Sequence, residues 1–419
     1  MIRKLKPILF LILILSALYG CDGETDAEYY NAMVDPPLKL IRSPYLQNNI
    51  ADSVTIAWKT TKTAKSCYIE FGTGSSDMVR KVGIVEPQRI NTMNYVTLHG
   101  LEPFEKYYYK VYTNETLLAE GEEYYFYSAQ SVCDQFSFIA VADVGQPPSW
   151  HGHFDETMDQ ISKMKVKPDL GLVLGDIVYP DGESEKADDY FFKKAAPLMR
   201  NTPVFAILGN HDHKSPVDVN FKQEWILPNN EHYYSFDYGT AHFIGLDSGD
   251  DSGLYDKDNQ LDWLENDLKE AQGKYDWTVV FLHHHGRTCS YKIQESDVIG
   301  MYPLFVKYGI DLVLNGHIHT YERLKPLDSL GNVLPAFSET EFVYPDIKDG
   351  FISVTAGTSG RPSSWEPNGE GYCKEGIVTR AIHELAFARV EIDKQKLFFE
   401  LISSENGDVL DHFTIDKGL

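Results

Sequence analysis

The chain has 419 residues, enough for two or three domains, and its apolar fraction of 43% and charged fraction of 24% exclude a disordered or fibrous protein. The formal net charge of −24 creates a long-range field that repels nucleic acids and anionic membrane surfaces, so we expect neither as a direct partner. A phosphate substrate is not excluded, because bound divalent cations set the local sign of a site.

The first 21 residues have the organisation of an export signal. Three basic residues precede the apolar run Ile8–Leu15, which is too short to span a bilayer comfortably. The segment ends in Leu-Tyr-Gly-Cys and resembles the bacterial lipobox, although Tyr19 replaces the usual small residue. We expect residues 1–21 to be a secretory signal peptide, with lipidation of Cys21 favoured over simple cleavage or an uncleaved anchor. Residues 22–37 would form a polar tether for a protein anchored in a bacterial envelope, periplasmic or at the cell surface.

Export makes disulfides permissible, and four cysteines remain once Cys21 is set aside: Cys67, Cys133, Cys289 and Cys373. Four cysteines allow three pairings. We favour Cys289–Cys373, because both residues lie in loops that we expect near the active edge. None shows the Cys-x-x-Cys spacing of a zinc ribbon, so structural zinc is not expected.

Residues 38–131 show short alternating strands separated by turns, the pattern of a small β-sandwich. Residues 101–111 follow the order Leu-x-Pro-x-x-x-Tyr-x-Tyr-x-Val, which resembles the E–F corner and F strand of fibronectin type III domains. Trp58 stands in the place of their strand-B tryptophan. The segment carries no catalytic constellation, so we interpret it as a rigid spacer or docking module.

From residue 134 to 419 the pattern changes to strands alternating with amphipathic helices, which predicts an α/β domain. The first strands are predicted over Phe136–Ala142, Leu170–Leu174 and Val204–Leu208, with helices over Phe154–Met164 and Tyr190–Met199 between them. Each of these strands ends in small and polar residues. In open α/β sheets the loops that follow the carboxyl ends of strands gather at one edge, where ligands bind.

The second half of this domain continues in the same way. Strands are predicted over 233–238, 242–246, 277–282 and 310–314, and a helix over Gln260–Ala271. Three tail strands, over 351–355, 387–392 and 396–402, are expected to complete a second sheet packed on the first. The segment Gly357–Gly376 is rich in Gly, Ser and Pro and is expected to be a loop over the active edge.

The strand ends supply a set of oxygen and nitrogen donors: Asp143, Asp176, Tyr179, Asn210, His211, His283, His317 and His319. Carboxylate, amide, phenol and imidazole groups together suit Mn, Fe or Zn. Each residue also has a simpler explanation. The aspartates are common as helix N-caps, Tyr179 fits a core position, and the run His283–His285 fits a solvated loop. The number and order of the motifs favour a shared metal site.

The ordered motifs Asp-x-Gly, Gly-Asp-x-x-Tyr, Gly-Asn-His-Asp, a strand-end His and Gly-His-x-His-x-Tyr-Glu-Arg resemble the calcineurin-like metallophosphoesterases. Tyr179 and the preceding β-domain make the chain most similar to the purple acid phosphatases, over roughly residues 38–415. The resemblance implies an α/β fold, the four-layer αββα sandwich of that superfamily, preceded by the fibronectin type III-like domain.

The resemblance also implies a ligand set. One metal would be held by Asp143, Asp176, Tyr179 and His319, and the other by Asp176, Asn210, His283 and His317. The first would be ferric iron if Tyr179 binds as a phenolate, and the second Fe, Zn or Mn. The implied reaction is hydrolysis of phosphate monoesters of small molecules by attack of a metal-bridging hydroxide.

Four further residues receive roles from their positions in these motifs. His211 would face the substrate and protonate the leaving alkoxide, with Asp212 orienting or charging its ring. Many members of the family have a proline soon after the strand-end histidine, whereas this chain has His284-His285-Gly286-Arg287. The neighbours of His283 are therefore competing candidates for the ligand position, and His285 or Arg287 is a candidate phosphate contact.

Two other functions stay open on the sequence. The same metals serve phosphodiesterases and nucleotidases, and Trp150 and Trp365 lie in loops near the active edge where they could stack a nucleobase. A surface binding protein with a vestigial site is the alternative from another class. We interpret Glu322 and Arg323 as a structural ion pair, and His213, His232 and His242 as surface or hydrogen-bonded histidines.

Overall fold

The computed structural model describes residues 37–74, 76–82, 92–130, 133–217, 220–290, 292, 294–337, 342–363 and 376–418. The predicted signal peptide with Cys21, residues 22–36 of the tether, Trp365 and Cys373 lie outside the described residues. Residues Lys39–Leu419 belong to one compact unit. Within the part of the chain that the structure describes, no helix is both long enough and apolar enough to cross a membrane.

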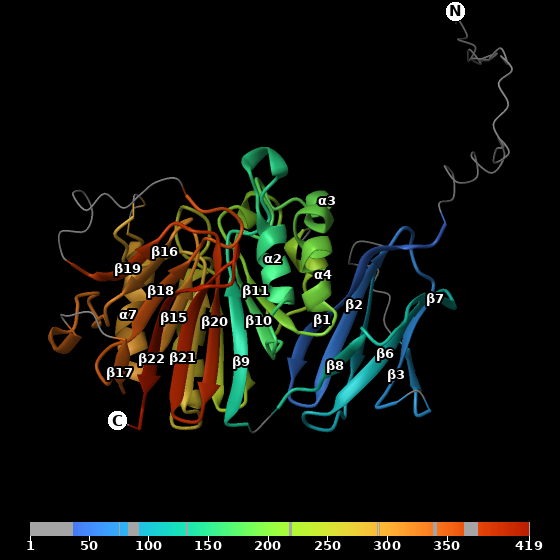
Figure 1. Cartoon of the computed structure of the whole chain (residues 1–419), viewed down its shortest axis with the longest axis horizontal. Coiled ribbons are helices and arrows are strands. Elements are labelled where there is room, and N and C mark those ends of the chain that lie inside the picture. The colour runs from blue at the N-terminus through green and yellow to red at the C-terminus, as the bar shows by residue number, and fades with distance from the viewer. Residues whose placement is uncertain are drawn as a thin grey trace, which may run out of the picture. The chain divides into compact units, whose positions relative to one another are not determined.

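An all-β region forms the first part of this unit, as predicted, and consists of two antiparallel sheets (Figure 1). The first sheet has the order β1-β2-β5, with strands Leu40–Ile50, Ser53–Thr60 and Met93–Leu98. The second has the order β4-β3-β6-β7, with strands Val79–Val82, Cys67–Gly72, Lys106–Thr113 and Thr116–Ala119, and β8, Tyr125–Tyr127, pairs with β6.

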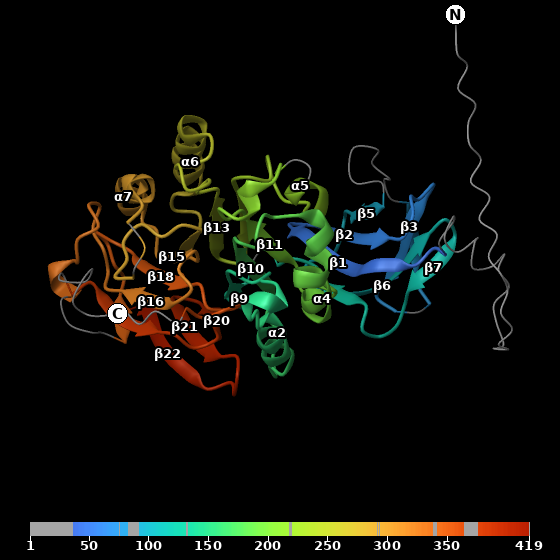
Figure 2. The same cartoon turned by 90° about the horizontal axis from the view of Figure 1, so that it is seen from above.

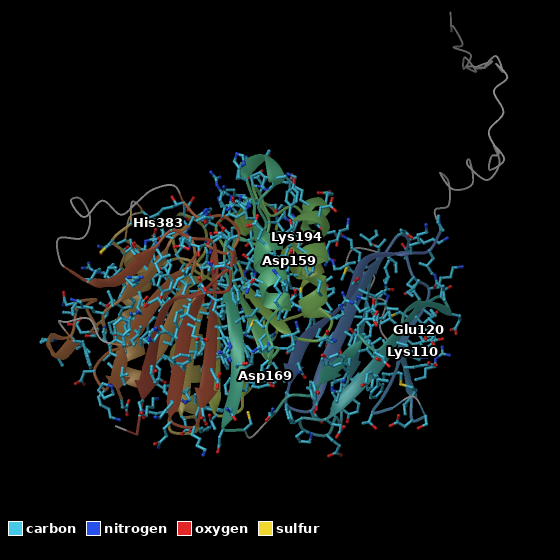
Figure 3. All side chains as sticks on the ribbon, in the orientation of Figure 1. Lys110, Glu120, Asp159, Asp169, Lys194 and His383 are labelled. Carbon is cyan, nitrogen blue, oxygen red and sulfur yellow. The ribbon has the colours of Figure 1, made fainter. Side chains whose placement is uncertain are left out.

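The core of the all-β region forms around Trp58, whose Nε1 donates to Thr113 Oγ1 at 2.8 Å. The predicted corner before β6 is closed by Tyr107, whose hydroxyl accepts the backbone N–H of Glu102 at 3.1 Å. On the second sheet Lys110 of β6 pairs with Glu120, the residue that follows β7 (Figure 3). The fibronectin type III assignment stays a prediction.

Two seven-stranded sheets form the second part of the chain. One sheet has the order β11-β10-β9-β20-β21-β22-β17, with strands Val204–Ile207, Leu170–Leu174, Gln135–Val141, Ala386–Asp393, Lys396–Ser403, Val409–Asp416 and Val343–Pro345. The other has the order β12-β13-β14-β15-β18-β16-β19, with strands Tyr234–Tyr238, Ala241–Leu246, Trp277–Leu282, Leu312–Asn315, Ile352–Ala356, Tyr321–Leu324 and Val378–Ile382.

The tail strands do not all join one new sheet, which corrects the sequence prediction. Strand β18 pairs with β15, whereas β20 pairs with β9 and extends the sheet of the first three strands. An alternating apolar pattern indicates that a strand is half-buried. It does not indicate which sheet the strand joins, because tertiary packing decides that. The tail therefore links both sheets into one mixed α/β fold.

The helices cover the outer faces of the two sheets. Figure 2 shows α6 and α7 over the sheet that contains β15, and α2 and α4 over the sheet that contains β9. The longer helices span Phe154–Ser162 (α2), Lys193–Met199 (α4), Lys257–Ala271 (α6) and Ser296–Tyr308 (α7). Shorter ones span Ser184–Ala187 (α3), Phe221–Glu224 (α5), and the single turns Pro148–Trp150 (η1), Asp188–Phe192 (η2), Asp212–Lys214 (η3) and Pro335–Phe337 (η4).

Helix α7 was not predicted from the sequence, because Pro303 lies inside it and breaks the usual helical signal. The helix that precedes β11 also begins earlier than predicted, since Ser184–Met199 is helical throughout with a wide turn at η2.

The parallel strands bring the predicted site residues to one edge. Strands β9, β10 and β11 run parallel, as do β13, β14, β15 and β18 in the other sheet. A single apolar cluster draws buried residues from both sheets and fills the space between them. The loops that leave the carboxyl ends of β9, β10, β11, β14 and β15 hold every predicted ligand.

Candidate metal centre

The first donor group surrounds the hydroxyl of Tyr179, which is buried. This oxygen lies 2.7 Å from Asp176 Oδ2, 3.0 Å from Asp143 Oδ1 and 3.1 Å from His319 Nε2. Tyr179 is therefore a core aromatic whose polar end reaches the site. The structure brings together all four residues of the first predicted ligand set.

The second donor group surrounds the amide oxygen of Asn210. Asn210 Oδ1 lies 3.0 Å from His317 Nδ1 and 3.2 Å from His283 Nε2. The other ring nitrogen of His283 donates to the carbonyl of Leu174 at 2.8 Å, which leaves the Nε2 lone pair directed into the site. The second predicted ligand set is thus also assembled, with His283 and not its neighbours against Asn210.

Asp176 lies between the two groups. Its Oδ2 faces Tyr179 at 2.7 Å, and its Oδ1 faces His283 Nε2 at 3.4 Å. One carboxylate therefore presents one oxygen to each donor group. Ligand atoms of Asp143, Asp176 and His283 all lie within 4.8 Å of one another, and all three residues are buried.

The backbone at three predicted ligands has a left-handed conformation that non-glycine residues rarely adopt. The φ angles are 57° at Asp143, 52° at Asp176 and 67° at His317. A Cβ on Gly209 would collide with the Asp176 carboxylate, and one on Gly316 would lie 2.8 Å from Asp143 Oδ2. Strained backbone and close loop approach at one point are typical of functional sites.

The charges of the site fit bound cations. The buried carboxylates of Asp143 and Asp176 have ion pairs, among the described residues, only with the imidazoles of His319 and His283. Burial together with Asp143 and Asp176 raises the pKa of Tyr179 well above its ordinary value, so without a cation the phenol keeps its proton. Buried carboxylates and a phenol without a Lys or Arg partner are a donor set that needs a metal to offset its charge. The residues present therefore fit two metal ions.

His211 lies beside the first donor group. Its ring centre is 4.3 Å from that of Tyr179, and its Nδ1 donates to the carbonyl of Pro180 at 2.5 Å. The Nδ1 proton fixes the tautomer and leaves Nε2 as the nitrogen that can hold or release a proton. The Nζ of Lys214 lies beside the same ring, 2.9 Å from Nδ1 and 3.5 Å from Nε2.

The predicted role of Asp212 is corrected by the structure. Its carboxylate accepts backbone N–H groups of Gly209, Ile177 and Val178 at 2.9 to 3.3 Å and does not bond to the ring of His211. Burial and the nearby Asp176 raise the pKa of Asp212 to about 7. Asp212 therefore ties the loop after β11 to the loop after β10. Residues next to each other at the start of a helical turn point in different directions, which the sequence did not reveal.

The histidine run after β14 is buried, so the alternative of a solvated loop is wrong. His284 Nδ1 lies 2.8 Å from Ser248 Oγ, and the ring of His285 lies 5.7 Å from that of His317. The guanidinium of Arg287 donates to Gln294 Oε1 at 2.5 Å. The ring contact with His317 places His285 beside the second donor group, and a phosphate contact of His285 or Arg287 stays a prediction.

Two residues near the site were not identified from the sequence as site residues. Gln146 Nε2 lies 3.4 Å from His319 Nδ1, and Lys214 approaches His211 as described above. Both residues could have been identified from the sequence, because each directly follows a predicted motif. Gln146 follows Asp-x-Gly, and Lys214 follows Gly-Asn-His-Asp-His.

Glu322 and Arg323 do not form the predicted ion pair. Adjacent residues on β16 point to opposite faces of the sheet. Arg323 pairs with Asp411 at 2.8 Å, whereas Glu322 accepts the hydroxyl of Thr288 at 2.7 Å. Both residues support the structure separately.

The remaining predictions concern histidines and cysteines outside the centre. His213 and His232 both bond to buried Asp247, at 2.8 and 2.6 Å, and His242 bonds to Asp237 and Asp267. Cys289 is disulfide-bonded, and Cys67 and Cys133 are thiols. Because Cys373 lies outside the described residues, the pairing Cys289–Cys373 stays a prediction.

The part of the chain that carries this site is similar to a known protein family. Residues 136–321 match the family of calcineurin-like phosphoesterases, and the match covers the strand ends that carry all seven predicted ligands. The chain carries a calcineurin-like phosphoesterase domain. Together with the purple acid phosphatase relatives, this match confirms the predicted class of the domain, that of a metal-dependent phosphoric-ester hydrolase.

Similar proteins are known from a plant and an animal. The chain is 27% identical to purple acid phosphatase 18 of Arabidopsis thaliana over 65% of its own length and 64% of that protein, less than two thirds of the relative. It is 24% identical to acid phosphatase type 7 of Danio rerio over 88% of its own length and 89% of that protein.

Among solved structures the chain is similar to the purple acid phosphatase PPD1 of yellow lupin, Lupinus luteus. The TM-score is 0.71 at 19% identity, and the match covers 89% of this chain and 74% of the lupin chain. At this identity the likeness establishes the mixed α/β fold.

Proposed function

We propose that this chain is an exported phosphatase that hydrolyses phosphate monoesters of small molecules at a dinuclear metal centre. The single observation that carries the proposal is the position of Asp176, whose two carboxylate oxygens face two separate donor groups at 2.7 and 3.4 Å. A carboxylate shared in this way is the expected bridge between two cations.

The donor chemistry supports an assignment of each metal. Tyr179, Asp143 and Asp176 offer hard oxygens that suit ferric iron, and His319 adds an imidazole nitrogen to this set. Asn210, His283, His317 and Asp176 offer a more neutral set that suits Fe, Zn or Mn as a divalent ion. Two bound cations would supply an acidic water and stabilise negative charge on the phosphate.

The chain's own residues would position the ester and move a proton. His211 Nε2 would donate a proton to the leaving alkoxide, while its Nδ1 stays bonded to the carbonyl of Pro180. The ammonium of Lys214 beside this ring would attract the substrate's phosphate in an otherwise acidic protein. On the other side, His285 and Arg287 would contact phosphate oxygens once the substrate is bound.

Metal analysis combined with two chromogenic esters tests the proposal. The purified full chain should contain two metals, hydrolyse p-nitrophenyl phosphate much faster than its bis-ester, lose activity on chelation and regain it on reconstitution. Asn210→Ala should retain one metal. A faster rate on the bis-ester would indicate a phosphodiesterase, and a metal-loaded protein without hydrolysis would indicate a binding protein.

Export and lipid anchoring belong to the same proposal and are supported by the sequence of residues 1–21. The full chain should fractionate with membranes in a bacterial host, and Cys21→Ala should release it. Retention of Cys21→Ala in the membrane fraction would exclude the lipid anchor.

A further inference from the structure

An exposed tryptophan lies beside Tyr179 of the first donor group. Trp150 is 39% exposed, and its ring centre lies 6.1 Å from that of Tyr179 at an interplanar angle of 64°. His211 also contacts Tyr179, with ring centres 4.3 Å apart. Trp150 and His211 therefore both contact the aromatic ring whose hydroxyl reaches the first donor group.

The loop that carries Trp150 is held in place by its own backbone. Pro147 and Pro148 restrict the chain before the single turn η1, where the Trp150 N–H donates to the Pro147 carbonyl at 2.9 Å. After the turn, the N–H of His153 donates to the carbonyl of Gly360 at 2.7 Å. A ring presented by an ordered loop can bind a ligand without the entropy cost of ordering that loop.

The exposure of Trp150 differs from that of other surface aromatics. Tyr127 is 43% exposed but stacks on Phe104 with ring centres 5.5 Å apart, and Phe342 stacks on His412 at 5.2 Å. Among the described residues, the ring contact of Trp150 is tilted against Tyr179 and not stacked, so a planar group can still lie on the indole face.

We propose that Trp150 is a stacking subsite for the base of a nucleoside monophosphate, so that the substrate class of the site is phosphate monoesters with a base on the leaving group. This inference rests on the proposed function. Trp150 contacts the ring of Tyr179, whose hydroxyl reaches the first donor group, so an aromatic group would reach the indole when a spacer such as a sugar separates it from the phosphate. Stacking on one face is tolerant of base identity, since every base has a flat face.

A pair of substrates with the same leaving atom isolates the contribution of the base. AMP and ribose 5-phosphate both release a primary alkoxide, so the demand on His211 is matched. Trp150→Ala should lower the ratio of kcat/KM for AMP to that for ribose 5-phosphate about tenfold, mainly through KM, and Trp150→Phe should retain most of it. Tyr127→Ala removes an exposed aromatic of the all-β region and should leave the ratio unchanged.

An unchanged ratio in Trp150→Ala, or equal losses on both substrates, would overturn the proposal. A change in the ratio for phosphotyrosine to phosphoserine without a change for AMP would replace it with an aryl phosphate subsite. Binding of adenosine alone, measured by equilibrium dialysis on the metal-loaded chain, tests the subsite without turnover and should weaken in Trp150→Ala. Equal adenosine binding by the wild type and Trp150→Ala would contradict the subsite, whether or not the chain hydrolyses phosphate esters. Absence of hydrolysis alone would refute only the proposed function.

Discussion

Tyr179 is the residue whose chemistry depends most on what the site contains. Its oxygen is within 3.1 Å of two carboxylates and an imidazole, and burial and the carboxylates hold its proton in place. A trivalent cation between these groups would reverse the balance, because it stabilises the phenolate and both carboxylates together. The same hydroxyl would therefore be a hydrogen-bond donor without metal and a ligand with it.

Replacing Tyr179 by phenylalanine tests this dependence. The ring keeps its packing against His211 and Trp150, but the oxygen is lost, so the visible absorption band of an iron–tyrosinate centre should disappear in Tyr179→Phe. Tyr234→Phe removes a buried hydroxyl that bonds to the carbonyl of Ala206 and should keep the band. A band of unchanged intensity in Tyr179→Phe would exclude Tyr179 as the ligand.

The proton that His211 is proposed to donate should matter most when the leaving group is a poor one. His211→Ala should keep both metals and lower kcat for alkyl phosphates by about 10²- to 10⁴-fold, with a much smaller loss for p-nitrophenyl phosphate. Steady-state kinetics over a series of esters measures the difference. His153→Ala, which removes an exposed histidine, is the control. An equal loss for every ester would contradict general acid catalysis by His211.

At the scale of the elements, charged contacts join the strand pair β12–β13 to helix α6. His242 on β13 bonds through Nδ1 to Asp237 on β12 at 2.7 Å and through Nε2 to Asp267 on α6 at 2.9 Å. The ring of Tyr275 stacks on it, with ring centres 5.2 Å apart. Burial lowers the pKa of His242, but the two carboxylates outweigh it and raise the pKa from 6.5 to about 9.

This raised pKa makes the stability of the fold depend on pH. The protonated ring favours the folded state, so its contribution is fully present below about pH 6.5 and is lost as the pH rises through about 9. The free energy of unfolding of the wild type should fall by on the order of 1 kcal/mol more than that of His242→Gln across this range. Urea titrations at fixed pH values measure it, and parallel pH profiles for the two proteins would contradict the assignment.

At the scale of the whole unit Lys39–Leu419, a buried charge network joins the all-β region to the α/β part. Arg42 and Lys59 on β1 and β2 contact Asp188 at 2.7 and 2.9 Å, and both also pair with Glu224. Glu224 in turn accepts a hydrogen bond from Ser184, which begins α3 shortly after the loop of Asp176 and Tyr179. The all-β region therefore supports the loop that carries two predicted ligands.

Breaking this network should cost far more than breaking a surface pair. Arg42→Met leaves buried carboxylates without their strongest partner and should lower the free energy of unfolding by about 3 to 5 kcal/mol. Arg80→Met removes an exposed pair with Glu115 and should change it by less than about 1 kcal/mol. Denaturant midpoints of the two variants provide the comparison, and similar values would show that the network carries no special stability.

The sequence by itself predicted the strands that carry the candidate site and the donor residues that follow each of them. In motifs such as Gly-Asn-His-Asp the candidate ligand, the turn and the strand end are adjacent in the chain. A short stretch of sequence is therefore enough to predict them. The all-β region followed from local strand patterns, and the calcineurin-like domain class followed from the resemblance of the ordered motifs to that family. Two short-range errors, the orientation of Asp212 and the pairing of Glu322 with Arg323, arose because neighbouring side chains point in different directions.

Only the tertiary structure decided which strands share a sheet, that β20 adds to β9, and that Arg42 reaches Asp188 across 146 positions of the chain. It also decided that Asp176 faces two donor groups at once and that Trp150 lies next to Tyr179. These relations join residues far apart in the chain, and long-range packing selects them from many pairings that satisfy the same local pattern equally well.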